Sequence, residues 1–189
     1  FGDLLDATAT QVPPDRPALI QGDRVILWPE FDRRSNRLAR AMLGMGLEPG
    51  SRIAILARNG PEYIEIAAAA FKARVSSVNV NYRYTAPEIE YVLRDSQSRV
   101  LYFQPEFRQV VDPLAGSIAG LRLIEIDDGE YGAAIRDGDG SPLVIKRSGD
   151  DGYLIYTGGT TGKPKGVIWR AADARATQLE SPAVKCVPQ

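Results

Sequence analysis

The stretch of this sequence best suited to chemistry is YTGGTTGKPKGV, at residues 156–167. Its glycines allow successive backbone N–H groups to point into one concave surface, and such a surface binds anions. Threonine hydroxyls and lysine ammonium groups add donors, and charge-assisted hydrogen bonds to phosphate are roughly twice as strong as neutral ones. An ordinary turn between two strands would need far fewer such residues. The pattern therefore predicts a phosphate-binding loop, whose side-chain donors are Thr157, Thr160, Thr161, Lys163 and Lys165.

This loop differs from the phosphate loop of switch NTPases. That motif is G-x-x-x-x-G-K-[ST], and it opens a helix. Here Gly162 and Lys163 are followed by Pro164, and the residue five before Gly162 is Thr157. The residues that follow, GVIW (166–169), favour a strand. The hydroxyl that binds Mg²⁺ in those proteins is absent, so a kinase or switch NTPase is not expected.

The composition excludes several other kinds of catalysis. The 189 residues include no histidine, which removes Ser-His-Asp and Cys-His catalysis and every histidine-ligated metal site. The single cysteine, Cys186, can form neither an internal disulfide nor a CxxC metal clasp. A formal net charge of -1 argues against nucleic acid as a partner, and no apolar run is long enough to cross a bilayer. The sequence thus predicts a cytoplasmic protein with no metal site and no transmembrane segment.

Helical and strand patterns alternate along the chain. Apolar residues at helical spacing predict a helix over residues 28–46 that ends at Gly46, and Pro61 stands near the start of another. Thr85 and Glu88 form a capping box before a third helix. Such alternation predicts an α/β fold with a layered, mostly parallel sheet and flanking helices. Strands are predicted over residues 51–59, 75–82, 98–103, 121–126, 152–157 and 166–169, with a weaker helix near 107–118.

The sequence changes character along its length and divides into four predicted parts. Residues 1–126 carry the alternating pattern and form an amino-terminal α/β subdomain. Residues 127–150 are acidic and rich in glycine, which is typical of a linker, with room for one short helix. Residues 151–170 contain a strand, the phosphate loop and a second strand. Residues 171–189 form a tail, whose first part has a helical pattern.

Other patterns in the sequence are weaker candidates for sites. GMGLEPG contains Gly44, Gly46 and Gly50, but it follows a helix and lacks the spacing of a dinucleotide fingerprint, so a helix cap is expected. DGDGSP has Pro142 where a calcium loop needs glycine. Glutamates on predicted helices are expected at the surface, and a group of tyrosines is expected in packing. These residues are Glu62, Glu65, Glu88 and Glu90, with Tyr82, Tyr84 and Tyr91.

The loop and its surroundings resemble the adenylate-forming, or AMP-binding, superfamily, which contains acyl-CoA synthetases, adenylation domains of peptide synthetases and luciferases. The resemblance extends from about Leu4 to Arg170, and residues 38–81 are similar to the family's early helix, strand and helix. PKGVIWR favours the fatty-acid and steroid-acid type of acyl-CoA ligase. The family usually has serine where Gly158 stands, although glycine also occurs there in some acyl-CoA ligases. After Arg170 the sequence departs from the family, so only the amino-terminal part of its fold is expected.

This resemblance implies an ATP-dependent acid–thiol ligase of fatty-acid metabolism. In that reaction a carboxylate attacks the α-phosphate of ATP, pyrophosphate leaves, and coenzyme A takes the acyl group from the acyl-adenylate. The small-molecule partners are therefore a carboxylic acid, ATP and coenzyme A. The resemblance places Mg²⁺ in a site completed outside this chain and places no catalytic residue within it. The phosphate-binding residues that it implies are Thr157, Gly158, Gly159, Thr160, Thr161, Gly162, Lys163, Pro164 and Lys165.

Two classes of function stay open at this point. The family's motifs for the Mg²⁺ site, the ribose and the late catalytic lysine are absent from this sequence. The chain alone is therefore expected to be inactive as an enzyme. The alternative is a non-catalytic fragment or remnant of such a ligase that acts only as a folded or interaction domain. A homodimer is compatible with the sequence, which identifies neither the oligomeric state nor the acid.

Overall fold

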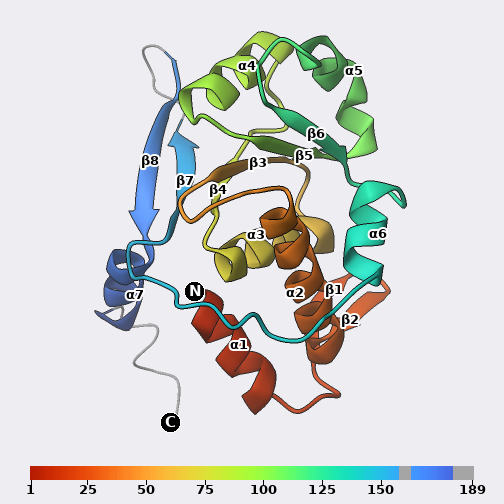
Figure 1. Ribbon diagram of the computed structural model, residues 1–189, viewed down its shortest axis with the longest axis vertical. Helices are drawn as coiled ribbons and strands as arrows, with labels where there is room; N and C mark the ends of the chain where they lie inside the picture. Colours follow the sequence, from red (N-terminus) through yellow and green to blue (C-terminus); the bar gives the residue numbers. More distant parts are fainter. Residues whose placement is uncertain (158–162, 181–189) are drawn as a thin grey trace.

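The computed structural model describes residues 1–157 and 163–180, the side chains of 178–180 excepted. Figure 1 shows a central sheet with helices on both of its faces, which confirms the predicted α/β class. The strands are β1 (Pro17–Gln21), β2 (Arg24–Leu27), β3 (Arg52–Leu56), β4 (Ser76–Asn79), β5 (Val100–Phe103), β6 (Arg122–Glu125), β7 (Gly152–Thr157) and β8 (Lys165–Arg170). The α-helices are α1 (Gly2–Gln11), α2 (Trp28–Gly44), α3 (Pro61–Ala73), α4 (Ala86–Asp95), α5 (Arg108–Val111), α6 (Glu130–Arg136) and α7 (Ala171–Glu180).

The central sheet is mostly parallel, as predicted. Among the described residues it has six strands in the order β6-β5-β3-β4-β7-β8. The first five of these strands run parallel, and β8 runs antiparallel to β7 at one edge. Strands β1 and β2 form a separate antiparallel pair.

The strand order explains which helices cover which face. The connection from β3 to β4 moves toward one edge of the sheet, and the next, from β4 to β5, moves back past β3 toward the other. Parallel crossovers are right-handed in nearly all proteins, so connections that move in opposite directions lie on opposite faces. Accordingly α3 and α6 pack on one face with α2, while α4 and α5 pack on the other.

Each face of the sheet has its own apolar cluster. Strand β3 contributes to both because successive side chains of a strand point to opposite faces. Ile53 and Ile55 pack with α2 and α3, whereas Ala54 and Leu56 pack with α4 and α5. The sequence of a strand that is buried on both faces is a continuous run of apolar residues, which is common in parallel strands.

The predicted glycine cap after α2 and the predicted capping box before α4 are both present. Gly46 adopts a φ of 75° directly after α2, and its N–H donates to the Leu43 carbonyl at 2.9 Å. This left-handed conformation favours glycine, so the helix-cap interpretation is confirmed. Before α4, the Thr85 N–H donates to Glu88 Oε2 at 2.7 Å. No helix of the described segments has the length and apolar character needed to cross a membrane.

The predicted helix near residues 107–118 is wrong as a single helix. In its place lie a 3-10 turn (Pro105–Phe107), the short α5 and a second 3-10 turn (Asp112–Leu114). Pro113 explains the interruption, since proline lacks a backbone N–H and is tolerated only in the first turn of a helix. Helix α1 and the β1–β2 pair have no counterpart among the predicted elements.

The acidic, glycine-rich stretch 127–150 packs on the domain over much of its length. It includes α6, whose Tyr131 and Ile135 are buried in the cluster shared with α2. Farther along the stretch, Arg40 of α2 donates a hydrogen bond to the Ser141 carbonyl at 2.7 Å. The stretch is therefore attached to α2 by buried apolar contacts and by a hydrogen bond. The division of the chain into four parts stays a prediction.

A buried cluster of charges attaches α1 to the rest of the fold. Lys72 of α3 is buried, and its Nζ lies 2.6 Å from Asp32 Oδ1 and 3.3 Å from Asp6 Oδ1. Arg147 Nη1 lies 2.8 Å from Asp6 Oδ2 and 2.7 Å from Asp3 Oδ1. The cluster therefore links α1, α2, α3 and the segment before β7 through ion pairs that are largely shielded from solvent, apart from the exposed carboxylate of Asp3.

Candidate functional site

The β7–β8 hairpin carries both arms of the predicted phosphate loop. Its register runs from Gly152 opposite Arg170 to Thr157 opposite Lys165. Thr157, Lys163 and Lys165 are exposed, and Pro164 is half-buried. The remaining predicted loop residues lie outside the described residues. They are Gly158, Gly159, Thr160, Thr161 and Gly162.

The hairpin opens at the carboxyl edge of the parallel sheet. Strand β7 is parallel to β4, with Asn79 opposite Ile155, so Thr157 leaves the sheet at the same edge as the residues that follow β4. The segments after β3 and β5 leave there too, because these strands also run parallel to β4. In open α/β sheets ligands bind at this edge, so the arms stand where a ligand is expected.

Exposed cations gather at this edge in addition to the two lysines. The guanidinium carbon of Arg58, which follows β3, lies 5.0 Å from the centre of the Tyr82 ring. Arg83 lies 5.6 Å from the same ring. Tyr82 is exposed between these two arginines instead of being packed in the interior, so the packing prediction for this residue is wrong. Arg58 is also paired with Glu106, its Nε lying 2.8 Å from Glu106 Oε1, so most of the positive charge that this edge offers to an anionic ligand comes from Arg83, Lys163 and Lys165.

Helix α4 contacts both arms of the hairpin. On the entering arm, the Tyr156 hydroxyl donates to Asp95 Oδ2 at 2.6 Å. On the leaving arm, the Tyr91 hydroxyl donates to the Pro164 carbonyl at 3.2 Å, and Lys163 Nζ lies 4.8 Å from the centre of the Tyr91 ring. The sequence predicted only a packing role for Tyr91, and no local pattern linked it to a loop more than seventy residues away.

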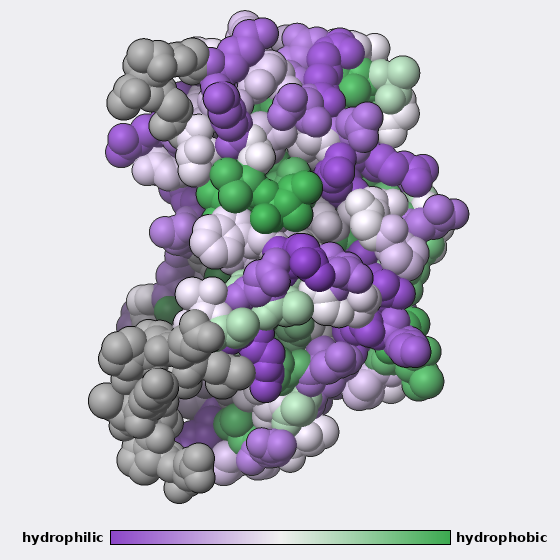
Figure 2. All heavy atoms as spheres, turned by 90° about the vertical axis from the view of Figure 1, so that its left-hand side faces the viewer, coloured by the Kyte–Doolittle hydropathy of each residue, from purple (hydrophilic) through white to green (hydrophobic). Residues whose placement is uncertain are grey.

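Strand β8 has no partner on its outer side within the described part of the chain. Its residues are all exposed, including Val167, Ile168 and Trp169. Figure 2 faces this side of the molecule and shows apolar side chains gathered on the surface. In the described structure the position of β8 therefore depends on its ladder with β7, on the stacking of Trp169 against Tyr153 and on the contacts from α4.

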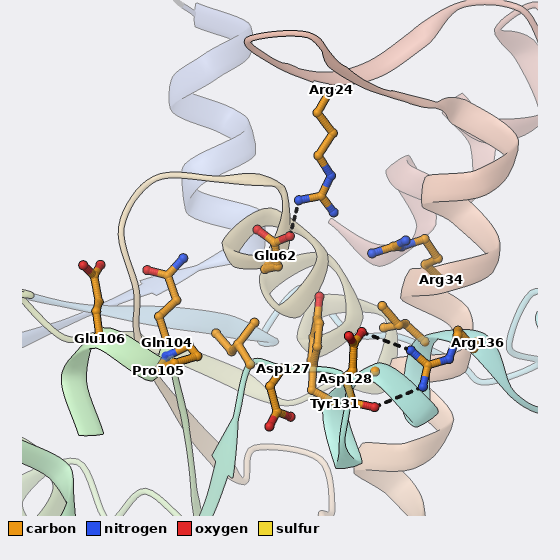
Figure 3. A pocket seen from close by; sticks show the side chains of 13 residues that line it. Arg24, Arg34, Glu62, Gln104, Pro105, Glu106, Asp127, Asp128, Tyr131 and Arg136 are labelled. Atoms are coloured by element: carbon orange, nitrogen blue, oxygen red, sulfur yellow. Dashed lines mark hydrogen bonds and ion pairs between the residues drawn. The ribbon is translucent and has the colours of Figure 1, made fainter. Parts of the chain in front are cut away.

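A cavity of about 690 Å³ lies farther along the same edge, beside the ends of β5 and β6. Figure 3 shows charged side chains from several elements around it. Most of these charges are already paired: Arg24 binds Glu62, and Arg136 lies 3.4 Å from Asp128. Because the pairs neutralise one another, the cavity presents little uncompensated charge to a ligand.

Behind the wall of this cavity lies a glutamate that was predicted to be at the surface. Glu65 is fully buried, so that prediction is wrong. Its Oε1 lies 2.7 Å from Arg34 Nε, and its Oε2 accepts hydrogen bonds from Arg34 Nη2 at 3.0 Å and from the Tyr131 hydroxyl at 2.6 Å. In the structure Glu65 shares a helical stripe with Ala69 and Lys72, which are also buried, but a stripe with two charged residues gave no sequence signal of that burial.

The contact with Glu65 makes the stability of this protein sensitive to alkaline pH. Burial raises the pKa of Tyr131, and the charge of Glu65 and its hydrogen bond raise it further. A tyrosine that keeps its proton in the folded state but loses it near pH 10 when unfolded lowers stability as the pH rises above 10. Above pH 10, we expect the free energy of unfolding to fall with pH less steeply in Tyr131→Phe than in the wild-type chain. The two slopes should differ by about 1.4 kcal/mol per pH unit. Urea denaturation between pH 8 and 11.5 measures this slope, and equal slopes would contradict the expectation.

Metal binding has little support in the described residues. They contain no group of three or more histidine, cysteine or carboxylate side chains placed to hold a metal ion. Near the hairpin, the Asp95 carboxylate accepts the Tyr156 hydroxyl. In the DGDGSP stretch, Asp139 accepts hydrogen bonds from the backbone and hydroxyl of Ser141 and pairs with Arg40.

Comparison with known proteins gives a consistent result. A family model described as AMP-binding enzyme matches residues 5–185. The chain is 35% identical over 188 residues to 3-oxocholest-4-en-26-oate–CoA ligase of Rhodococcus rhodochrous, an alignment that covers 92% of this chain and 33% of the relative. It is 36% identical over 190 residues to the medium-chain acyl-CoA ligase Mig of Mycobacterium avium, covering 88% and 34%. The chain thus spans about a third of the length of these relatives.

Solved structures show the same similarity in three dimensions. The anthranilate CoA ligase AuaEII, determined in complex with anthranoyl-AMP, superposes with a TM-score of 0.86 at 25% identity, over 94% of this chain and 36% of that one. A fatty acyl CoA synthetase of Mycobacterium tuberculosis superposes with a TM-score of 0.80 at 26% identity, over 90% and 34%. These neighbours share the layered α/β arrangement described above.

Proposed function

The chain belongs to the AMP-binding enzyme family, and on this premise we propose that it carries the ATP phosphate-binding hairpin of an acid–thiol ligase. The acid is a fatty or related carboxylic acid, and the thiol is coenzyme A. The observation that carries the proposal is the opening of the β7–β8 hairpin at the carboxyl edge of the sheet, with Thr157, Lys163 and Lys165 exposed on its arms. The named relatives, which are CoA ligases, support this choice of reaction.

The proposed chemistry has two steps. The carboxylate of the acid attacks the α-phosphorus of ATP, the bond to the bridging oxygen breaks, and pyrophosphate leaves with the electron pair. The thiol of coenzyme A then gives up its proton to water, its sulfur bonds to the acyl carbonyl carbon, and the bond from that carbon to the phosphate oxygen breaks, so that AMP leaves. The first step needs no histidine base at the hairpin, because the attacking carboxylate is already ionised at neutral pH.

The hairpin residues have an electrostatic role in the first step. We propose that the ammonium groups of Lys163 and Lys165 and the hydroxyl of Thr157 bind the β- and γ-phosphates and stabilise the charge that develops on pyrophosphate. Preorganised donors of this kind contribute on the order of 3 kcal/mol each. The other predicted loop residues belong to the same proposal: Gly158, Gly159, Thr160, Thr161 and Gly162 with backbone or hydroxyl donors, and Pro164 as part of the turn.

The described residues supply no complete site for the magnesium ion that accompanies ATP. The Asp95 carboxylate, which contacts the hairpin, accepts a hydrogen bond from the Tyr156 hydroxyl. The described part of the chain holds no group of three or more histidine, cysteine or carboxylate side chains that could bind a metal ion. Oxygen ligands are what magnesium requires, with several of its positions filled by water and phosphate. We therefore assign no step of the reaction to a metal held by these residues.

Titration of this chain with inorganic tripolyphosphate, ATP and AMP tests the phosphate assignment. We expect tripolyphosphate and ATP to bind weakly and AMP to bind more weakly still, because the hairpin grips the polyphosphate and not the nucleoside. Lys163→Ala should weaken tripolyphosphate binding, whereas Lys146→Ala, an exposed lysine elsewhere in the chain, should not. Equal effects of the two substitutions would contradict the proposal, and sub-micromolar ATP binding by this chain would contradict the expected weak affinity.

In the whole protein the same substitution separates the two steps. Lys163→Ala should slow acyl-adenylate formation by about 100-fold, a typical loss for one transition-state donor. Transfer of the acyl group from preformed acyl-adenylate to coenzyme A should slow much less, because pyrophosphate has already left. Pyrophosphate exchange measures the first step and thioester formation the second. If both steps slow equally, the assignment to pyrophosphate departure is wrong.

The second candidate is a folded domain without catalytic turnover. The chain spans about a third of the length of the relatives named above. Under this alternative, a well-folded chain binds neither tripolyphosphate nor ATP. The titrations described above therefore distinguish the two candidates.

A further inference from the structure

Helix α4 presents two side chains to the open end of the hairpin. Tyr91 and Asp95 are four residues apart and so lie on the same face of the helix. Figure 1 shows α4 beside the end of the hairpin at which the loop begins. One of the two side chains binds the strand that enters the loop, and the other binds the segment that leaves it. The helix therefore braces the two arms against a single rigid element.

The contact with the entering arm depends on a glycine in the opposite strand. Tyr156 and Gly166 are register partners. A Cβ atom at position 166 would lie 2.9 Å from Cζ of the Tyr156 ring, closer than real Cβ atoms approach other atoms. The absence of a side chain at Gly166 lets this ring cross the hairpin, so that its hydroxyl reaches Asp95.

The contact with the leaving arm holds a lysine that the proposed function requires. The Lys163 ammonium lies over the Tyr91 ring. The Tyr91 hydroxyl donates a hydrogen bond to the carbonyl of Pro164, the residue that follows Lys163. A lysine ammonium over an aromatic ring gains roughly 0.5–1 kcal/mol at an exposed site. A free lysine side chain loses up to about 2 kcal/mol of conformational entropy when it is fixed by a ligand.

We infer that Tyr91 is a positioning residue, which holds Lys163 at the mouth of the phosphate loop before the ligand arrives. The inference rests on the proposed function, because it assigns the preorganised lysine to the polyphosphate of ATP. Preorganisation improves affinity by reducing the ordering that binding itself must impose. Tyr91 does not touch the phosphate; it acts through Lys163 and through the Pro164 carbonyl.

The lysine–ring contact has a spectroscopic signature that is independent of ligand binding. Reductive ¹³C-methylation keeps the charge of lysine and labels the few lysines of this chain. The methyl signals of Lys163 should be shifted upfield by the Tyr91 ring. The shift should persist in Tyr91→Phe and vanish in Tyr91→Leu. Unshifted Lys163 signals in the wild-type chain would overturn the inference.

The positioning role is tested with inorganic tripolyphosphate as the ligand. We expect Tyr91→Leu to weaken its binding about 3- to 10-fold, by analogy with the loss of a preorganised contact. Tyr91→Phe keeps the ring and loses only the hydrogen bond to Pro164, so it should weaken binding less. Tyr84→Phe is the matched control for Tyr91→Phe, since it also removes only a tyrosine hydroxyl, just before α4. Amide spectra establish that each variant is folded.

The outcomes separate the inference from the proposed function. Tripolyphosphate binding that Lys163→Ala weakens but Tyr91→Leu leaves unchanged would overturn the inference and leave the proposed function standing. An absence of binding by the wild-type chain would overturn both. Parallel losses of the ring-current shift and of affinity in Tyr91→Leu would support the positioning role, because a purely structural tyrosine would not link the two readouts.

Discussion

Replacing Arg34 by methionine should lower the free energy of unfolding by about 3–5 kcal/mol, the loss expected when one partner of a buried ion pair is removed. Arg34 supplies two of the three groups that contact the fully buried carboxylate of Glu65: Nη2 donates a hydrogen bond to Oε2, and Nε lies 2.7 Å from Oε1 as an ion pair. Without it, only the Tyr131 hydroxyl remains to stabilise that charge. Urea denaturation at neutral pH measures the loss.

Two further variants show whether the loss comes from the uncompensated carboxylate. Arg33 is the exposed neighbour of Arg34 on α2, so Arg33→Met makes the same chemical change without touching Glu65. It should alter stability by less than about 0.5 kcal/mol. Combining Arg34→Met with Glu65→Leu should recover much of the lost stability, because replacing both partners of a buried pair removes the orphaned charge. A double variant less stable than Arg34→Met alone would contradict this account.

Replacing Gly152 by alanine should destabilise the hairpin that carries the proposed phosphate site. A Cβ atom there would overlap the carbonyl oxygen of Trp169 and lie 3.1 Å from its carbonyl carbon. Both atoms belong to the backbone of β8, so the strand itself must move to make room. Overpacking of this kind costs about 1–3 kcal/mol. We expect faster amide hydrogen exchange in β7 and β8 and weaker binding of tripolyphosphate.

The control for this variant is a glycine with open space around it. Gly44 is the last residue of α2, and a Cβ atom there would have no heavy atom within 4 Å. Gly44→Ala should therefore be neutral or stabilising by up to about 1 kcal/mol, since alanine favours the helix. If Gly152→Ala matches Gly44→Ala in stability and in hydrogen exchange, the close approach of β7 and β8 does not constrain the hairpin.

Local patterns in the sequence determined the type and order of most elements that carry the site. Apolar runs of strand length gave β3 to β8, and helical spacing gave α2, α3 and α4. These patterns work because a strand or helix must turn its apolar side chains toward the core at its own period. The unusual content of the loop likewise predicted its chemistry, since hydroxyls, glycines and lysines together favour bound phosphate.

The contacts that position the site were decided only by the tertiary structure. Tyr91 meets Pro164, Glu65 meets Tyr131, and Lys72 meets Asp6, all across large separations in the chain. No periodicity encodes such pairs, because they depend on the order of the strands and on which face each crossover helix covers. The burial of Glu65 shows the same limit: propensity favours a charged residue at the surface, and only the arrangement of α2, α3 and α6 supplies the partners that allow it inside.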